Sequence, residues 1–166
     1  MLYRAFYPSP CGDILLESDG ENLTGLRFLE GEGAPPARLR AGTAVPVLEA
    51  AVFWLDRYFQ GEAPAADLPL KVSGTPFQGQ VWAILREIPY GETLSYGEVA
   101  AVIGEKRGGK TGLLARAVGS AAGRNPVALL IPCHRLIAAD GSLGGYAYGS
   151  EIKRYLLNLE GASFRA

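Results

Sequence analysis

A cysteine and a histidine stand next to each other late in the chain, as Cys133-His134, between Pro132 and Arg135. Cysteine acts as a nucleophile through its thiolate, and a free thiol has a pKa of about 8.5. Three features of this stretch are expected to lower that pKa: a helix N-terminus after Pro132, the adjacent imidazole and the adjacent guanidinium. The pattern indicates nucleophilic catalysis, with the histidine as proton acceptor and a carboxylate that orients it.

Direct contact between the two side chains is not expected. Neighbouring residues point apart on a strand and about 100° apart on a helix, so a water or a bent turn should join Cys133 to His134. The carboxylates that are candidates for orienting the imidazole are Glu160, Glu151 and Asp140. The alternative is that Cys133 is a small core residue after an apolar run, and that His134 is a buried imidazole with satisfied hydrogen bonds.

The composition limits the other kinds of site. With Cys11 and Cys133 as the only cysteines and a single histidine, a four-ligand zinc site would need carboxylates, so we predict no metal and no cofactor. The count alone would allow a Cys11–Cys133 disulfide, but nothing indicates an oxidising compartment. No apolar run approaches the ~18 residues of a membrane span, and no signal peptide is recognised. We therefore expect a cytoplasmic protein without a membrane partner.

The charge of the chain is unevenly distributed. The 166 residues carry 16 basic and 17 acidic side chains, and this net charge of −1 by itself argues against a nucleic-acid partner. Residues 1–70, however, have a net charge of −5, and residues 71–166 have a net charge of +4. Together with 48% apolar residues, this indicates a globular protein whose second part is suited to a polyanion.

The elements before residue 75 are predicted to be mostly strands. Alternating apolar and polar residues indicate antiparallel strands at 2–7, 14–17 and 23–28. Ser18 to Glu21 is expected to form a hairpin turn, and Leu48 to Phe59 a helix closed by Gly61. The proline-containing stretch 61–74 is expected to link two subdomains, residues 1–70 and 71–166.

The second subdomain is predicted to consist of short helices. Thr75-Pro76-Phe77-Gln78 has the capping box and first-turn proline that begin one helix. Ser95-Tyr96-Gly97-Glu98 is a second capping box, opening a helix expected to end at Gly104. Thr111 is expected to begin a third helix that runs to Ala122. Two helices joined by a turn, in a basic context, suggest a helix-turn-helix.

The remaining elements follow these helices. Val127 to Ile131 is an unbroken apolar run that we place in the core. Asp140-Gly141 is predicted to be the turn of a hairpin that forms a wing. Ser150 is expected to cap the last helix. The buried face of that helix is predicted to consist of Ile152, Tyr155, Leu156 and Leu159.

The segment Asn125 to Ile137, NPVALLIPCHRLI, resembles the active-site signature of the O6-alkylguanine-DNA alkyltransferases, also called methylated-DNA–protein-cysteine methyltransferases. Other segments resemble further motifs of this family in the same order: 9–12, 93–100, 115–119, 144–146 and 156–161. The resemblance covers essentially the whole chain. It implies an α/β (α+β) fold, in which a small RNase H-like N-terminal subdomain with an antiparallel sheet and helix precedes a mostly helical subdomain with a winged helix-turn-helix.

The resemblance also implies an activity, the direct reversal of DNA damage. The alkyl group of O6-alkylguanine in duplex DNA, and secondarily of O4-alkylthymine, would move irreversibly to Cys133 after base flipping. Each molecule would act once, without a cofactor, as a monomer, with cooperative binding along DNA left open. His134 would activate Cys133 through a water, Glu160 would orient His134, and Asn125 would hold the active-site turn together.

The resemblance assigns further residues to the bound DNA. Tyr96 would sit beside the flipped nucleotide, Arg116 would fill the space that the base leaves, and Tyr146 would lie in the loop that closes over the guanine. We place Arg135 with the residues that bind substrate or DNA. Small residues beside Arg116 would let that helix approach the minor groove closely: Ala115, Gly119 and Ser120.

The sequence departs from the family pattern in two places. The linker 104–111 is longer than expected, and we hypothesise that its cations Lys106, Arg107 and Lys110 contact phosphates; the alternative is a solvated loop. Ala147 follows Tyr146 where some relatives have a serine, so we expect only backbone N–H groups to be left to stabilise O6.

Two other classes of protein are compatible with part of the pattern. A non-catalytic lesion-binding relative would flip and flag the base, but such relatives lack the acceptor cysteine, and Cys133 argues against this class. A Cys–His hydrolase or thiol-dependent transferase for small molecules would turn over many times. Such an enzyme would need no tyrosine and arginine on a helix-turn-helix.

Overall fold

The computed structural model describes residues 2–29, 45–107 and 111–165, and the side chains of 105–107 and 111–113 are not described. The chain forms two compact units. The first comprises residues 1–72 with 126–128, and the second comprises residues 73–125 with 129–166. None of the helices among the described residues is long and apolar enough to cross a membrane.

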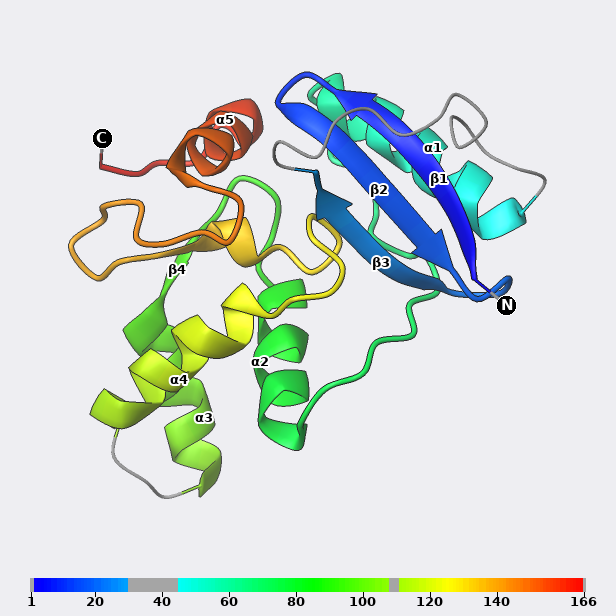
Figure 1. The fold of residues 1–166 in the computed structure, drawn as a ribbon. Helices are drawn as coiled ribbons and strands as arrows, with labels where there is room; N and C mark the ends of the chain where they lie inside the picture. The colour runs from blue at the N-terminus through cyan, green and yellow to red at the C-terminus, as the bar shows by residue number, and fades with distance from the viewer. Residues whose placement is uncertain (1, 30–44, 108–110, 166) are drawn as a thin grey trace. The chain divides into compact units, whose positions relative to one another are not determined.

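The first unit is an antiparallel sheet with one helix against it (Figure 1). Its elements are β1 (Tyr3–Ser9), β2 (Gly12–Ser18), β3 (Leu23–Phe28) and α1 (Pro46–Phe59). The strands pair in the order β1-β2-β3. The predicted turn between β2 and β3 is present, because the Asp19 carboxylate accepts from the N–H groups of Glu21 and Asn22 at 2.9 and 2.7 Å. Gly20 has φ +105°, a conformation that favours glycine.

A segment distant in sequence extends this unit at the outer edge of β3. The Leu26 N–H donates to the Pro126 carbonyl, and the Ala128 N–H donates to the Leu26 carbonyl, both at 3.0 Å. These bonds pair the segment with an edge strand that would otherwise expose unpaired backbone groups. The apolar run Val127 to Ile131 is buried throughout, as expected.

The second unit is mostly helical (Figure 1). Its elements are α2 (Pro76–Arg86), β4 (Leu94–Ser95), α3 (Tyr96–Arg107), α4 (Thr111–Gly123), the short 3₁₀ helix η2 (Cys133–Arg135), β5 (Leu136–Ile137) and α5 (Ser150–Glu160). An antiparallel sheet with its helix, followed by a mostly helical region, confirms the predicted mixed α/β fold class.

Both predicted capping boxes are present. The Thr75 hydroxyl accepts from the Gln78 N–H at 3.1 Å, and the Gln78 side chain accepts from the Thr75 N–H at 3.0 Å. Ser95 and Glu98 make the same reciprocal pair, at 3.0 Å in each direction. The end predicted for α3 is wrong, since this helix continues through the buried Gly104 to Arg107. The supposed linker 104–111 is therefore partly helical.

Two predictions in the last part of the chain also need correction. The turn around Asp140-Gly141 exists, since the Ala138 N–H donates to the Ser142 carbonyl at 3.0 Å, but β5 does not pair within that hairpin. It pairs in parallel with β4 instead. Helix α5 has Gly149 as its N-cap, so Ser150 is its first residue and not its cap.

The buried face of α5 also differs from the expected one. It consists of Lys153, Leu156, Leu157 and Glu160. Tyr155, expected to be buried, is 36% exposed. The pattern of apolar residues does not indicate this face, because two charged residues, Lys153 and Glu160, lie on it.

Candidate active site

Cys133 lies at the start of η2 and is only 6% exposed. The preceding turn is held by Asn125, whose Nδ2 donates to the Ile131 carbonyl at 2.6 Å and to the Cys133 sulfur at 3.2 Å. Within this turn Leu129 has φ +70°, a left-handed conformation that costs a residue with a side chain about 1–2 kcal/mol. A strained turn and a side chain that bridges it thus place the sulfur.

A cavity of about 460 Å³ opens beside this sulfur. Tyr96, Gly145, Tyr146 and Ala147 line it together with Cys133. The rest of its wall comes from small residues of α4: Ala115, Gly119, Ala122 and Gly123. Small residues on α4 thus leave open space next to Cys133.

His134 is completely buried and pairs with Glu160, the last residue of α5. The imidazole Nε2 and the carboxylate Oε2 are 2.7 Å apart. Of the other two candidate carboxylates, Glu151 is exposed, and Asp140 accepts a hydrogen bond from Ser142 at 2.6 Å. Because Nε2 is hydrogen-bonded to Glu160, Nδ1 is the ring nitrogen through which His134 would act on Cys133.

Burial dominates the electrostatics of the Cys133 thiol. Burial raises the pKa of Cys133, and the hydrogen bond from Asn125 and the positive charge of Lys153 act in the opposite direction. The three features expected from the sequence do not supply this lowering. Helix η2 has only three residues, and the guanidinium of Arg135 is turned to Glu160.

The surroundings favour the neutral form of the His134 imidazole and the ionised form of the Glu160 carboxylate. Burial lowers the pKa of His134, against the raising effect of Glu160. Burial also acts to raise the pKa of Glu160, but the hydrogen bonds and charges of His134 and Arg135 outweigh it and hold that pKa well below its usual range. The resting pair is therefore a neutral imidazole that donates from Nε2 to an ionised carboxylate.

Arg135 does not lie where the sequence analysis placed it. We grouped it with DNA-binding residues, but it is 8% exposed, and its Nε and Nη2 donate to Glu160 at 2.8 and 3.1 Å. Its Nη1 donates to the Ile88 carbonyl at 2.7 Å. A guanidinium with all three nitrogens bonded to the protein interior is not a DNA contact.

Lys153 was not predicted from the sequence as part of this region. This residue of α5 is completely buried, and its Nζ donates to the carbonyl oxygens of Leu136, Leu143 and Gly145, the last at 3.0 Å. It thus connects α5 to the segment that carries the cavity wall. Its position seven residues before Glu160, on the same helical face, was the available signal.

Tyr96 begins α3 and is packed closely by glycines. Its hydroxyl donates to the Gly145 carbonyl at 3.2 Å. A Cβ at Gly144 would lie 2.9 Å from the Tyr96 ring, and one at Gly119 would lie 3.5 Å from it. Tyr146 makes an edge contact with Tyr148, with ring centroids 5.5 Å apart.

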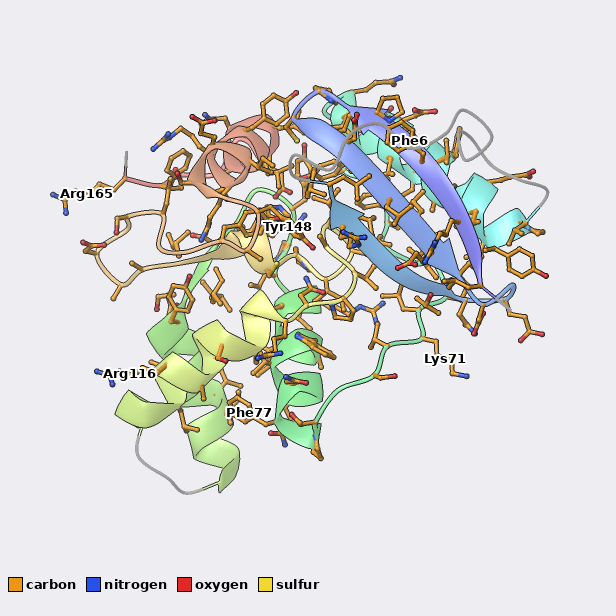
Figure 2. All side chains as sticks on the ribbon, in the orientation of Figure 1. Phe6, Lys71, Phe77, Arg116, Tyr148 and Arg165 are labelled. Carbon is orange, nitrogen blue, oxygen red and sulfur yellow. The ribbon has the colours of Figure 1, made fainter. Side chains whose placement is uncertain are left out.

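The other residues assigned to DNA lie on α4 or outside the described part. Arg116 is exposed and points away from the helix (Figure 2). Ser120 is also exposed, whereas Ala115 and Gly119 line the cavity. Lys110 lies outside the described residues, and so do the side chains of Lys106 and Arg107.

The thiols and carboxylates of the described residues form neither a disulfide nor a metal site. Cys11 and Cys133 are both free. Among residues 2–29, 45–107 and 111–165, no three His, Cys, Asp or Glu side chains come together as metal ligands would.

Comparison with known families matches both parts of the chain. Residues 2–72 match the model "6-O-methylguanine DNA methyltransferase, ribonuclease-like domain", and residues 76–162 match "6-O-methylguanine DNA methyltransferase, DNA binding domain".

Individual relatives agree with this match. The methylated-DNA–protein-cysteine methyltransferase of Haemophilus influenzae is 42% identical over 96% of this chain and 86% of that protein. The methylated-DNA–protein-cysteine methyltransferase of Methanosarcina acetivorans is 43% identical over 97% of this chain and 99% of that protein. The crystal structure of the Mycobacterium tuberculosis O6-methylguanine methyltransferase has 43% identity and a TM-score of 0.79, covering 100% of this chain and 96% of that one. The crystal structure of the M. tuberculosis protein in complex with DNA has 43% identity and a TM-score of 0.81, covering 96% of this chain and 92% of that one. The chain therefore belongs to the O6-alkylguanine-DNA alkyltransferases, the family of the methylated-DNA–protein-cysteine methyltransferases.

Proposed function

We propose that this protein repairs DNA directly by moving the alkyl group from O6 of guanine in duplex DNA to the sulfur of Cys133. One observation carries the proposal: the sulfur borders a cavity and is followed by the buried His134–Glu160 pair, 2.7 Å apart. A nucleophile, a proton acceptor and an orienting carboxylate are the groups that this transfer needs. The relative from M. tuberculosis that was crystallised in complex with DNA supports DNA as the partner.

The reaction is a single displacement at carbon. The thiol proton passes through a water to Nδ1 of His134, and the thiolate attacks the alkyl carbon. The S–C bond forms as the C–O6 bond breaks, the electron pair goes to O6, and the proton on the imidazole returns to guanine at N1. The thioether on Cys133 has no good leaving group, so each molecule acts once.

The alkylated base must leave the stack to reach this sulfur. Extrusion costs roughly a few kcal/mol, and the cavity wall at Tyr96 and Tyr146 provides surfaces on which a planar base can rest. Arg116, exposed on α4, fills the gap in the stack, and the small residues Ala115 and Gly119 let α4 approach the minor groove. Asn125 holds the sulfur in place while the base enters.

Further parts of the proposal concern substrate range and DNA contacts. O4-alkylthymine is the second substrate, and the protein acts as a monomer. Lys106, Arg107 and Lys110 neutralise phosphates beside the lesion. Replacing these three by alanine should flatten the dependence of DNA affinity on salt by about 0.9 in log–log slope for each lost contact. An unchanged slope would remove them from the interface.

The proposal is tested with duplex DNA that carries radiolabelled O6-methylguanine. We expect one label per protein molecule, none in Cys133→Ser, and full transfer in the matched control Cys11→Ser. Tight binding without transfer would identify a lesion-binding protein instead. Release of many labels per molecule, or transfer that persists in Cys133→Ser, would also refute the proposal.

A further inference from the structure

The carboxylate of Glu160 is shared between the imidazole and a guanidinium. Its Oε2 accepts from His134 Nε2 at 2.7 Å and from Arg135 Nη2 at 3.1 Å. Its Oε1 accepts from Arg135 Nε at 2.8 Å and from the Gly91 N–H at 3.2 Å. Four donors therefore converge on one carboxylate, which has no exposed side-chain surface.

The guanidinium is itself fixed on its other sides. Arg135 Nη1 donates to the Ile88 carbonyl at 2.7 Å, and the Tyr90 ring lies under the guanidinium carbon at 5.8 Å. The Tyr90 hydroxyl donates in turn to the Leu159 carbonyl at 3.3 Å. The segment before β4 thus holds Arg135 against the end of α5.

We infer that Arg135 is a positioning residue for alkyl transfer, which balances the buried charge of Glu160 and so keeps His134 neutral and able to accept the thiol proton. This inference rests on the proposed function of the same site. It assigns to Arg135 a role in the chemistry in place of the DNA contact expected from the sequence.

The physical reason is the cost of an unpaired buried charge. An ionised carboxylate in the protein interior must be compensated, and Arg135 does so with two hydrogen bonds. If Arg135 were absent, the cheapest remaining compensation would be a proton on His134, which would make an imidazolium–carboxylate pair. An imidazolium cannot take the proton of the Cys133 thiol.

The other ionisable groups around His134 do not replace Arg135. Lys153 of α5 repels a proton on the imidazole, as Arg135 does, but its Nζ is bound to backbone carbonyls and not to Glu160. Tyr90 faces Glu160 as a neutral phenol whose own pKa is raised, first by burial and then by that carboxylate. Cys133 itself is the proton donor.

The test uses the fact that His134 is the only histidine in the chain. In untagged protein with ¹⁵N-labelled histidine, the imidazole titration is read directly by NMR. In the wild type it should lie below the ordinary value of about 6.5. In Arg135→Gln it should rise by about one pH unit or more, and in Arg135→Lys, which keeps the charge but not the paired contact, by less.

The rate of alkyl transfer provides the second readout. The acid limb of the single-turnover rate should move upward with the imidazole titration, so that at a pH well below both titrations transfer slows by about tenfold in Arg135→Gln. The yield of label per folded molecule should stay at one. Arg154→Gln, the same substitution at an exposed position of α5, should change neither the titration of His134 nor the acid limb of the transfer rate.

Two outcomes would overturn the inference. One is a wild-type imidazole that titrates at or above the ordinary value. The other is an acid limb and a titration that do not move in either Arg135 variant, which would leave Arg135 a purely structural role. Failure of the proposed function is distinguishable, since in that case the wild type would carry no label on Cys133.

Discussion

Replacing Lys153 by methionine tests how the protein holds a buried cation beside its active site. Lys153 is completely buried, and its Nζ donates to the carbonyls of Leu136, Leu143 and Gly145. Methionine has a similar length but neither the charge nor the donors. The substitution therefore removes both the free-energy cost of burying the charge and the stabilisation from the hydrogen bonds.

The two contributions are similar in size at neutral pH. Burial lowers the pKa of Lys153 from 10.5 to about 8, so the buried charge costs about 3 kcal/mol at about 1.4 kcal/mol per pKa unit. Without the lysine, the buried carbonyls of Leu136 and Leu143 lose their donor, at about 1–3 kcal/mol each. The exposed Gly145 keeps its hydrogen bond from Tyr96. We expect the free energy of unfolding at pH 7 to change by no more than about 3 kcal/mol.

The pH dependence is the sharper result. Because the folded pKa lies below the unfolded one, the unfolded chain binds more protons between about pH 8 and pH 10.5, and stability rises with pH in that window. The wild type should gain about 2 kcal/mol from this group between pH 7 and about pH 9.5. The methionine variant cannot gain it, so its deficit should grow by the same amount.

Urea unfolding at the two pH values measures this difference, with the fluorescence of Trp82 as a probe of the second unit. Trp82 is buried, and its Nε1 donates to the Ala121 carbonyl at 2.9 Å. Lys71→Met, at an exposed lysine (Figure 2), is the control and should change stability by less than about 0.5 kcal/mol at either pH. An equal deficit at both pH values in the Lys153 variant would refute the reasoning.

Three further predictions follow from the geometry of the site. Asn125→Ala removes the hydrogen bond to the Cys133 sulfur, which is worth about 1.5–3 kcal/mol to a thiolate. The substitution should slow single-turnover methyl transfer by about tenfold to a hundredfold, and an unchanged rate would contradict this. Gly144→Ala puts a methyl group 2.9 Å from the Tyr96 ring at φ +67° and should lower both the melting temperature and the transfer rate, whereas Gly79→Ala, with nothing within 4 Å, should not lower the melting temperature. The pKa of Glu160 is held below its ordinary value of about 4.5, so its contribution to stability is present above that pH and is lost as the pH falls further. Glu160→Gln should abolish this loss of stability in acid. Identical acid unfolding curves for the variant and the wild type would disprove this.

Local signals in the sequence predicted much of the secondary structure. Both capping boxes involve residues three positions apart, so the bonds that begin α2 and α3 are visible in the sequence. The hairpin turn at Asp19 is equally local. The end of α3 was misjudged because Gly104 costs only about 1 kcal/mol inside a helix, an amount that burial in the fold outweighs.

Interactions between distant residues were beyond such signals. Strand β5 has only two residues, and its parallel pairing with β4 joins segments about forty positions apart. No local turn motif predicts a pairing over that distance. The buried face of α5 was misjudged for a related reason. Lys153 and Glu160 read as solvated charges until the partners that satisfy them are known.

The candidate site divides in the same way. The sequence alone predicted Cys133 as the nucleophile and His134 as the proton acceptor, because a cysteine beside a histidine in this context indicates that chemistry by its residue types. The residue types left three carboxylates open as partners of His134, the family resemblance implied Glu160, and the tertiary structure shows that contact. Only the tertiary structure decided where Arg135 points. Those contacts span 25 or more positions, and whether a guanidinium binds a phosphate or an internal carboxylate depends on burial, which follows from the packing of the whole unit.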